Sequence, residues 1–242
     1  MVPPCDPAAE AVFRPVQAGN ALEVTVERLM SAIRLGVVPA GARFPAERDL
    51  AARLGVSRIT LREAIRLLQR QGYVESRRGR SGGTFVAGLP SRPTPEEARR
   101  ELSETGTVLE DLLAFRRGLE TGTVVRLAET GLTGAQGDLL DRRAGVAAEA
   151  GTADYRRCDT VFHITLAQLT GSTRMAAALT DVRMRINQLM DVVPLSEAGL
   201  AASDGEHRRI VRAVRERDPE AARRALGEHL EGAERRLREL LG

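Results

Sequence analysis

The 242-residue sequence contains three histidines, and their positions are not scattered. His163 follows Asp159 by four residues, so on a helix the two side chains project from the same face about one turn apart. His207 and His229 each recur with apolar residues at helical spacing and therefore point toward a helical core. Imidazole and carboxylate groups that meet inside a helical bundle form a site for a divalent cation such as zinc, nickel or manganese. A single inward histidine is more often an ordinary core residue, so the pattern alone leaves both interpretations open.

The region that carries these residues is predicted to be helical throughout. Helices are expected at 95–103, 107–130, 133–150, 153–170, 172–192, 204–217 and 219–241. Gly131, Gly151, Gly171 and Pro194 mark breaks, and a capping box from Ser203 to Glu206 marks the start of one helix. The fold class is therefore mainly α, with an antiparallel bundle of six or seven helices in the C-terminal part.

Two residues beside the candidate ligands are assigned other roles. Cys158 precedes Asp159 but points about 100° away on a helix, so we expect it in the core. Glu206 precedes His207, and its helical angle turns it off the histidine face. A metal-dependent hydrolase needs an open ligand position and a general base beside the bound water. Because no residue is placed as that base, the sequence favours a protein that is not an enzyme.

Positive charge is concentrated in the N-terminal third of the chain. Between Gln17 and Gly88 there are twelve arginines and six acidic residues, a net charge of +6, whereas the whole chain has a net charge of +3. A cationic unit within a nearly neutral chain indicates a polyanionic partner.

The same third is predicted to contain three helices and a small β-hairpin. The first helix runs from about Gln17 to Leu35, and the second follows Pro45. Gly55 allows a sharp corner after the second helix, and Ser57 is placed to cap the third. Strands near 73–76 and 84–86 flank a tip that is rich in arginine and glycine. This order of elements predicts a winged helix-turn-helix.

The third helix has two different faces. Its apolar face consists of Leu61, Ala64, Ile65 and Leu68, and its cationic face of Arg58, Arg62 and Arg66. A helix of this width fits the major groove of B-DNA, where an arginine can donate two hydrogen bonds to a guanine. For an isolated helix, the alternative is that the arginine face is simply exposed to water and binds nothing. Here the turn, the cap and the hairpin all favour DNA.

Linker and helix-start signals in the sequence divide the chain into four segments. We expect a flexible tail at 1–16, the winged helix-turn-helix at 17–87, a linker with a linker helix at 88–106, and the helical domain at 107–242. Thr94 and Glu97 form a capping box at the start of the linker helix.

The composition indicates a cytoplasmic protein. No segment approaches 18 uninterrupted apolar residues, and the first residues lack the charge and apolar pattern of an export signal. Cys5 and Cys158 form no disulfide framework, which fits a reducing compartment. We therefore expect no membrane partner.

The stretch from Glu27 to Val86 closely resembles the DNA-binding domain of the GntR family of bacterial transcription regulators. The resemblance rests on the segments FPAERDLA, GVSRITLREAIRLL and GYVE. It implies that operator DNA is contacted by Arg48, Ser57, Arg58, Thr60, Arg62, Arg78 and Gly79. Ile59 stands where a small polar residue is common in the family, and the wing has an additional SGG. These departures prevent the base preference of the family from being carried over.

The segments DTVFHITL and EHRRIVRAVRERDPEAARRALGEHL resemble the FCD-type ligand-sensing domain of the FadR subfamily, over about 107–239. The resemblance implies that a divalent metal ion, zinc before nickel or manganese, is held by Asp159, His163, His207 and His229. Arg116 matches a family pattern and can bind a carboxylate effector through two hydrogen bonds, although an ordinary surface salt bridge is the alternative. Asn187 is a further candidate for the pocket, and Thr173 stands where the family usually has asparagine.

Together these features predict a DNA-binding transcription regulator, specifically a repressor. We expect a homodimer on a near-palindromic operator, with one third helix in each half-site. A small organic acid bound at the metal-containing pocket would control the affinity for the operator. A metalloregulator that senses the ion itself, and a metal-dependent hydrolase with a DNA-binding domain, are the two alternatives.

Overall fold

The computed structural model describes residues 21–34, 38, 40–79, 82–88, 94–104, 108–152 and 154–241. The predicted tail at 1–16, the start of the first predicted helix at 17–20, and the linker residues 89–93 and 105–106 lie outside the described residues. The chain divides into two compact units, with the boundary between residues 89 and 90.

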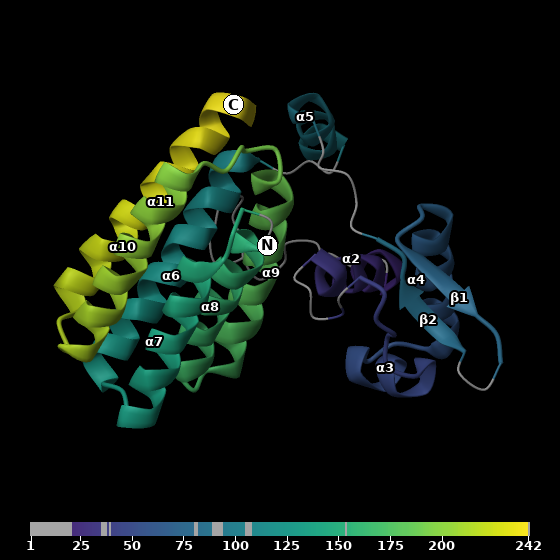
Figure 1. Cartoon of the computed structure of the whole chain (residues 1–242), viewed down its shortest axis with the longest axis horizontal. Helices are drawn as coiled ribbons and strands as arrows, with labels where there is room; N and C mark the ends of the chain where they lie inside the picture. The colour runs from purple at the N-terminus through teal and green to yellow at the C-terminus, as the bar shows by residue number, and fades with distance from the viewer. Residues whose placement is uncertain are drawn as a thin grey trace, which may run out of the picture. The chain divides into compact units, whose positions relative to one another are not determined.

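The described part of the N-terminal unit contains three helices and a two-stranded antiparallel sheet (Figure 1). The helices are α2 (Ala21–Arg34), α3 (Glu47–Leu54) and α4 (Arg58–Arg70), and the strands are β1 (Val74–Arg77) and β2 (Gly83–Val86). The register pairs Val74 with Val86 and Arg77 with Gly83. The predicted winged helix-turn-helix is thereby confirmed.

Two local features produce the corner between α3 and α4. Gly55 adopts a left-handed conformation with φ of 67°, which a residue with a β-carbon rarely adopts. Ser57 then caps α4, because its hydroxyl accepts a hydrogen bond from the backbone N–H of Thr60 at 3.0 Å. Both residues therefore act as the sequence predicts.

The two predicted faces of α4 are also present. Its buried residues are Leu61, Ala64, Ile65 and Leu68, and they join a core that includes Leu29 and Ile33 of α2. Arg58, Arg62 and Arg66 are exposed on the outside. The core thus fixes α4 by one face and leaves the cationic face free.

Seven helices make up the described part of the C-terminal unit (Figure 1). They are α5 (Pro95–Glu104), α6 (Leu109–Thr130), α7 (Gly134–Glu149), α8 (Tyr155–Leu169), α9 (Thr173–Met190), α10 (Glu197–Arg215) and α11 (Pro219–Leu241). Helix α6 contacts α8, α9, α10 and α11 and so lies at the centre of the bundle. Thr94 and Glu97 form the predicted capping box of α5.

One predicted helix start is wrong. The structure begins α10 at Glu197, where Ser196 accepts a hydrogen bond from the backbone N–H of Gly199. Ser203 lies inside this helix, is buried, and hydrogen bonds to the hydroxyl of Tyr155 on α8. The capping box predicted from Ser203 to Glu206 therefore does not exist. The good helix formers between Glu197 and Ala202 allow the helix to start about two turns earlier.

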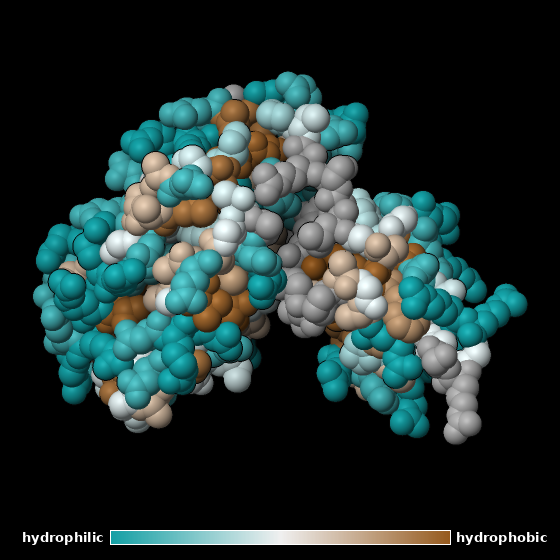
Figure 2. Space-filling view, viewed as in Figure 1, coloured by the Kyte–Doolittle hydropathy of each residue, from teal (hydrophilic) through white to brown (hydrophobic). Residues whose placement is uncertain are grey.

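The surface is mainly polar. On the face seen in Figure 2, hydrophilic residues cover much of each unit, and smaller hydrophobic areas are scattered among them. Among the described residues, only Val24, Ile59, Val108, Phe115 and Val146 are large, apolar and exposed. No helix in the described ranges has both the length and the apolar character needed to cross a bilayer.

Candidate functional site

The four candidate ligands converge from three helices. Asp159 and His163 project from α8, His207 from α10 and His229 from α11. One ligand atom from each lies within 4.8 Å of the others. The Asp159 Oδ1 atom is 3.6, 3.1 and 3.9 Å from the Nε2 atoms of His163, His207 and His229, respectively. The structure therefore brings together all four residues that the sequence singled out.

These separations suit ligands of one metal ion. Two donor atoms bound at about 2.0 to 2.1 Å in a tetrahedral arrangement lie roughly 3.3 Å apart. The Nε2 atoms of His163 and His229 are 3.1 Å apart, in the same range. Both ring nitrogens of His207 are buried, and among the described residues neither has a partner in hydrogen-bond geometry. A buried polar atom without a partner destabilises the fold, so the donor set fits a cation.

The protonation states also suit metal binding. Burial lowers the pKa of His207 and of His229, which keeps both imidazoles neutral. Burial by itself raises the pKa of Asp159, but the Arg183 guanidinium and His163 outweigh it and hold this pKa well below its usual range. Neutral imidazoles and an ionised carboxylate are the forms that bind metals.

Two further carboxylates lie against the Nδ1 atoms of two of the histidines. Glu120 Oε2 of α6 lies 2.6 Å from His163 Nδ1, and Glu206 Oε2 of α10 lies 3.0 Å from His229 Nδ1. The hydrogen bond to Glu206 fixes the His229 ring so that Nε2 is the atom offered to the metal, whereas the contact of Glu120 with His163 is an ion pair without hydrogen-bond geometry. The sequence turns Glu206 off the face of α10 that carries His207, but it does not predict the contact with His229. Its helical angle does turn it away from His207, but it turns it toward α11, which carries His229.

Arg183 of α9 is a central residue that the sequence analysis missed. The side chain is completely buried, and it bonds to Glu120 Oε1 at 3.2 Å and to Asp159 Oδ2. It thus joins a ligand to the carboxylate that supports another ligand. Its position between Leu179 and Ile186, inside an apolar helical stripe, is the signal that could have identified it.

Arg116 is buried as well. The alternative that it forms an ordinary surface salt bridge is therefore wrong. Only 3% of the residue is exposed, and its Nε donates to Glu120 Oε1 at 2.9 Å. Its Nη1 is buried and has no hydrogen-bond partner among the described residues. Burial opposes ionisation of Glu120, but His163, Arg183 and Arg116 together hold the pKa of this carboxyl well below its usual range.

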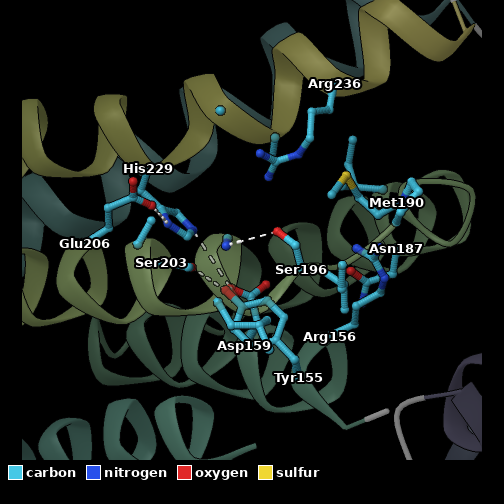
Figure 3. A pocket seen from close by; sticks show the side chains of 18 of the residues that line it. Tyr155, Arg156, Asp159, Asn187, Met190, Ser196, Ser203, Glu206, His229 and Arg236 are labelled. Atoms are coloured by element: carbon cyan, nitrogen blue, oxygen red, sulfur yellow. Dashed lines mark hydrogen bonds and ion pairs between the residues drawn. The ribbon is translucent and has the colours of Figure 1, made fainter. Parts of the chain in front are cut away.

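A cavity of about 160 Å³ opens beside the ligand cluster (Figure 3). Asp159 and His229 line it, together with both predicted effector residues, Arg116 and Asn187. The rest of the polar lining includes Tyr155, Arg156, Arg183, Ser203, Glu206 and Arg236. In Figure 3 the Arg236 side chain extends from α11 toward the cavity. The cavity thus combines a candidate metal centre with several cationic and hydrogen-bonding groups.

The seven predicted DNA contacts are exposed or half-buried residues of the N-terminal unit. Arg48, Ser57 and Arg58 are exposed, as are Arg62, Arg78 and Gly79, and Thr60 is half-buried. Arg48 pairs with Asp49 at 3.2 Å and Arg62 with Glu47 at 2.7 Å, in exposed ion pairs that a phosphate can replace. Arg80 and Ser81 of the wing lie outside the described residues.

A hollow lies between the wing and the two helices before it. It is lined by Arg43, Arg48, Arg58 and Arg77. The Nη1 of Arg43 donates to the carbonyl of Gly82 at 3.2 Å. Gly83 permits this approach, because a β-carbon there would lie 2.7 Å from Arg43 Cδ. The predicted DNA contacts include neither Arg43 nor Arg77.

Comparisons with known proteins match each of the two units to a protein family. Residues 22–86 match the family described as bacterial regulatory proteins, gntR family, and residues 111–232 match the FCD domain. The chain is 33% identical to the HTH-type transcriptional regulator RmpR of Mycobacterium gastri, over 93% of this chain and 82% of RmpR. It is 31% identical to the HTH-type transcriptional repressor NanR of Citrobacter rodentium, over 90% of this chain and 85% of NanR. The solved structure of E. coli McbR/YncC has the same fold, with a TM-score of 0.54, 18% identity, and coverage of 92% of this chain and 99% of that one.

Loss of a charge should destabilise the fold more at a buried ion pair than at an exposed one. Changing Glu120→Gln should lower the free energy of unfolding by about 3 kcal/mol, because it leaves Arg116 and Arg183 buried without their shared counter-charge. Urea unfolding with a chelator present, so that bound metal does not contribute, measures this. The control is Glu110→Gln, which removes an exposed pair with Arg238 and should change stability little. Equal losses in the two variants would contradict the role given to Glu120.

Proposed function

Since the chain belongs to the GntR family of bacterial regulatory proteins and carries an FCD domain, we propose that it is a repressor controlled by a small organic acid. The acid would bind at a metal ion in the FCD domain and alter the affinity of the winged domain for its operator. The chain is a DNA-binding transcription regulator, and its relatives are regulators and not enzymes.

The observation that carries this proposal is the meeting of two kinds of group in one cavity. Asp159 and His229 line the cavity from the candidate ligand cluster, and Arg116 also lines it, with a buried Nη1 that has no hydrogen-bond partner among the described residues. A guanidinium in that position is suited to a carboxylate, since it offers a directed and charged hydrogen bond. Tyr155 and Asn187 add further hydrogen-bonding groups for hydroxyl or amide substituents.

Asp159, His163, His207 and His229 would hold the ion, with zinc as the first choice and nickel or manganese as the others. When bound, the ion supplies a positive charge and open coordination positions that attract an anionic ligand. Glu120 and Glu206 orient two of the histidines, and Arg183 balances the charge of Asp159. A hydrolase, which also needs a metal, is disfavoured because the relatives are transcription regulators.

We propose that α11 and α5 connect the cavity to the linker. His229 and Arg236 of α11 line the cavity, and Leu237 of the same helix is in a core cluster with Ala98 and Leu102 of α5. A ligand that shifts α11 would therefore act on α5, which leads back to the linker. The ligand can change DNA affinity only by binding one arrangement of the chain better than another.

On DNA, we propose a homodimer that places one α4 in each half-site of a near-palindromic operator. Arg58 and Arg62 are exposed near the start of α4 for contacts with base edges, and Arg48, Arg78 and Gly79 are exposed for contacts with the backbone. The net charge of the N-terminal third supports this assignment.

The metal centre predicts a loss of bound metal in ligand variants. His207→Ala and Asp159→Asn should each lower the metal content from about one ion per chain to near zero, measured by elemental analysis after dialysis. Glu206→Gln should weaken metal affinity by roughly 10- to 100-fold, because it supports a ligand without being one. Asp111→Asn, an exposed change on α6, is the control and should retain the metal. Full metal content in His207→Ala would exclude that residue from the ligand set.

The effector site predicts stabilisation by a small carboxylate in the metal-loaded protein. At 100 times its dissociation constant the acid should stabilise the fold by about 2.7 kcal/mol and weaken operator binding. Arg236→Gln should weaken acid binding roughly ten-fold, and Arg235→Gln, an exposed neighbour that does not line the cavity, should not. Thermal shift and operator-binding titrations measure both effects. If operator affinity follows free metal with no acid present, the chain is a metalloregulator and this proposal is wrong.

If α4 enters the major groove, loss of Arg58 should reduce the affinity for DNA in a base-specific way. Arg58→Ala should weaken operator binding by about 1 to 3 kcal/mol and relax the preference at one base position. Arg126→Ala, which removes an exposed arginine of the bundle, controls for the change in net charge. Fluorescence anisotropy on operator variants distinguishes the outcomes, because an equal loss on unrelated DNA would make Arg58 a phosphate contact.

A further inference from the structure

Ile59 is a large apolar residue on the otherwise cationic outward face of α4. It is 74% exposed, more than the other exposed large apolar residues of the described chain. It lies in the first turn of α4, between Arg58 and Thr60. On the helix it precedes Arg62 by three residues and Arg66 by seven, so it shares the outward face with both. The Ile59 side chain therefore does not belong to the hydrophobic core of the domain.

We infer that Ile59 reads the methyl group of a thymine in the major groove of the operator. The inference rests on the proposed function, since it requires that α4 enters that groove. Residues in the first turn of a recognition helix are the ones that contact base edges. The Ile59 side chain has no hydrogen-bond donor or acceptor, so only an apolar part of a base edge is complementary to it. In the major groove of unmodified DNA that part is the C5-methyl group of thymine.

The same side chain would reject other bases. Cytosine presents an amino group in the major groove, and its burial against Ile59 would remove water from a donor without supplying an acceptor. Arg58 and Arg62 on either side can donate to guanine in the same groove. The first turn of α4 would thus read a thymine next to one or more guanines, a preference that a small polar residue at position 59 would not impose.

A protein partner at this surface is the competing interpretation. A second copy of the same surface is disfavoured by charge, because Ile59 is surrounded by Arg58, Arg62 and Arg66. These arginines suit a polyanion, and a groove between two phosphate chains provides one. The position of Ile59 within the cationic face therefore favours DNA as its occupant.

The test begins with selection of bound sequences from a random duplex library by the wild-type chain. Each thymine of the enriched sequence is then replaced by deoxyuridine, which lacks only the methyl group. At one position in each half-site we expect the wild-type affinity to fall roughly four-fold, the loss of one buried methyl contact. Replacement of that thymine by 5-methylcytosine should retain more affinity than replacement by cytosine.

Two variants complete the test. Ile59→Ala should bind the thymine and deoxyuridine duplexes equally, and its own selection should no longer enrich that thymine. Val24→Ala, which shortens an exposed aliphatic residue of α2, should keep the wild-type discrimination. If the wild type selects an operator but ignores deoxyuridine at every position, the inference about Ile59 is wrong and the regulator remains. If it enriches no sequence, the proposed function fails, and this inference fails with it.

Discussion

The burial of Asp159 among three imidazoles depends on a cation close by, and that cation is Arg183. A carboxylate removed from water is strongly destabilising unless it is paired and hydrogen bonded. Arg183 bonds to Asp159 and to Glu120, and Glu120 in turn lies against His163 and Arg116. One guanidinium thus links a candidate ligand, the carboxylate that orients another ligand, and the arginine that faces the cavity. The positions of these groups depend on each other.

This dependence explains why the site needs a bundle with α6 at its centre. Glu120 of α6 can reach Arg183 on α9 and His163 on α8 because α6 contacts both helices. His207 and His229 come from α10 and α11, which also contact α6. The apolar residues around them, including Phe162, Leu166, Ile210 and Leu226, are almost completely buried and hold these helices in register. Close packing therefore limits movement of the ligands relative to one another.

The sequence could predict the candidate ligands but not their supporting residues. Apolar periodicity identifies the buried face of one helix, and that was enough to place Asp159 and the three histidines inside. It cannot identify the neighbouring helix that a residue reaches, which is why the contact of Glu206 with His229 was not predicted. A charge inside an apolar stripe marks Glu120 and Arg183 as buried, but only the contact between α6 and α9 reveals that they pair.

The same limit explains the outcomes in the rest of the fold. The corner at Gly55, the cap at Ser57 and the two faces of α4 are local features, so the sequence predicted them correctly. The start of α10 was misplaced because Ser203 and Glu206 have the spacing of a capping box. Their actual partners, Tyr155 and His229, lie on α8 and α11. Local rules therefore suffice for the winged domain, whose proposed contacts lie on its surface, whereas the buried site of the sensor domain is defined by contacts between helices that are distant in sequence.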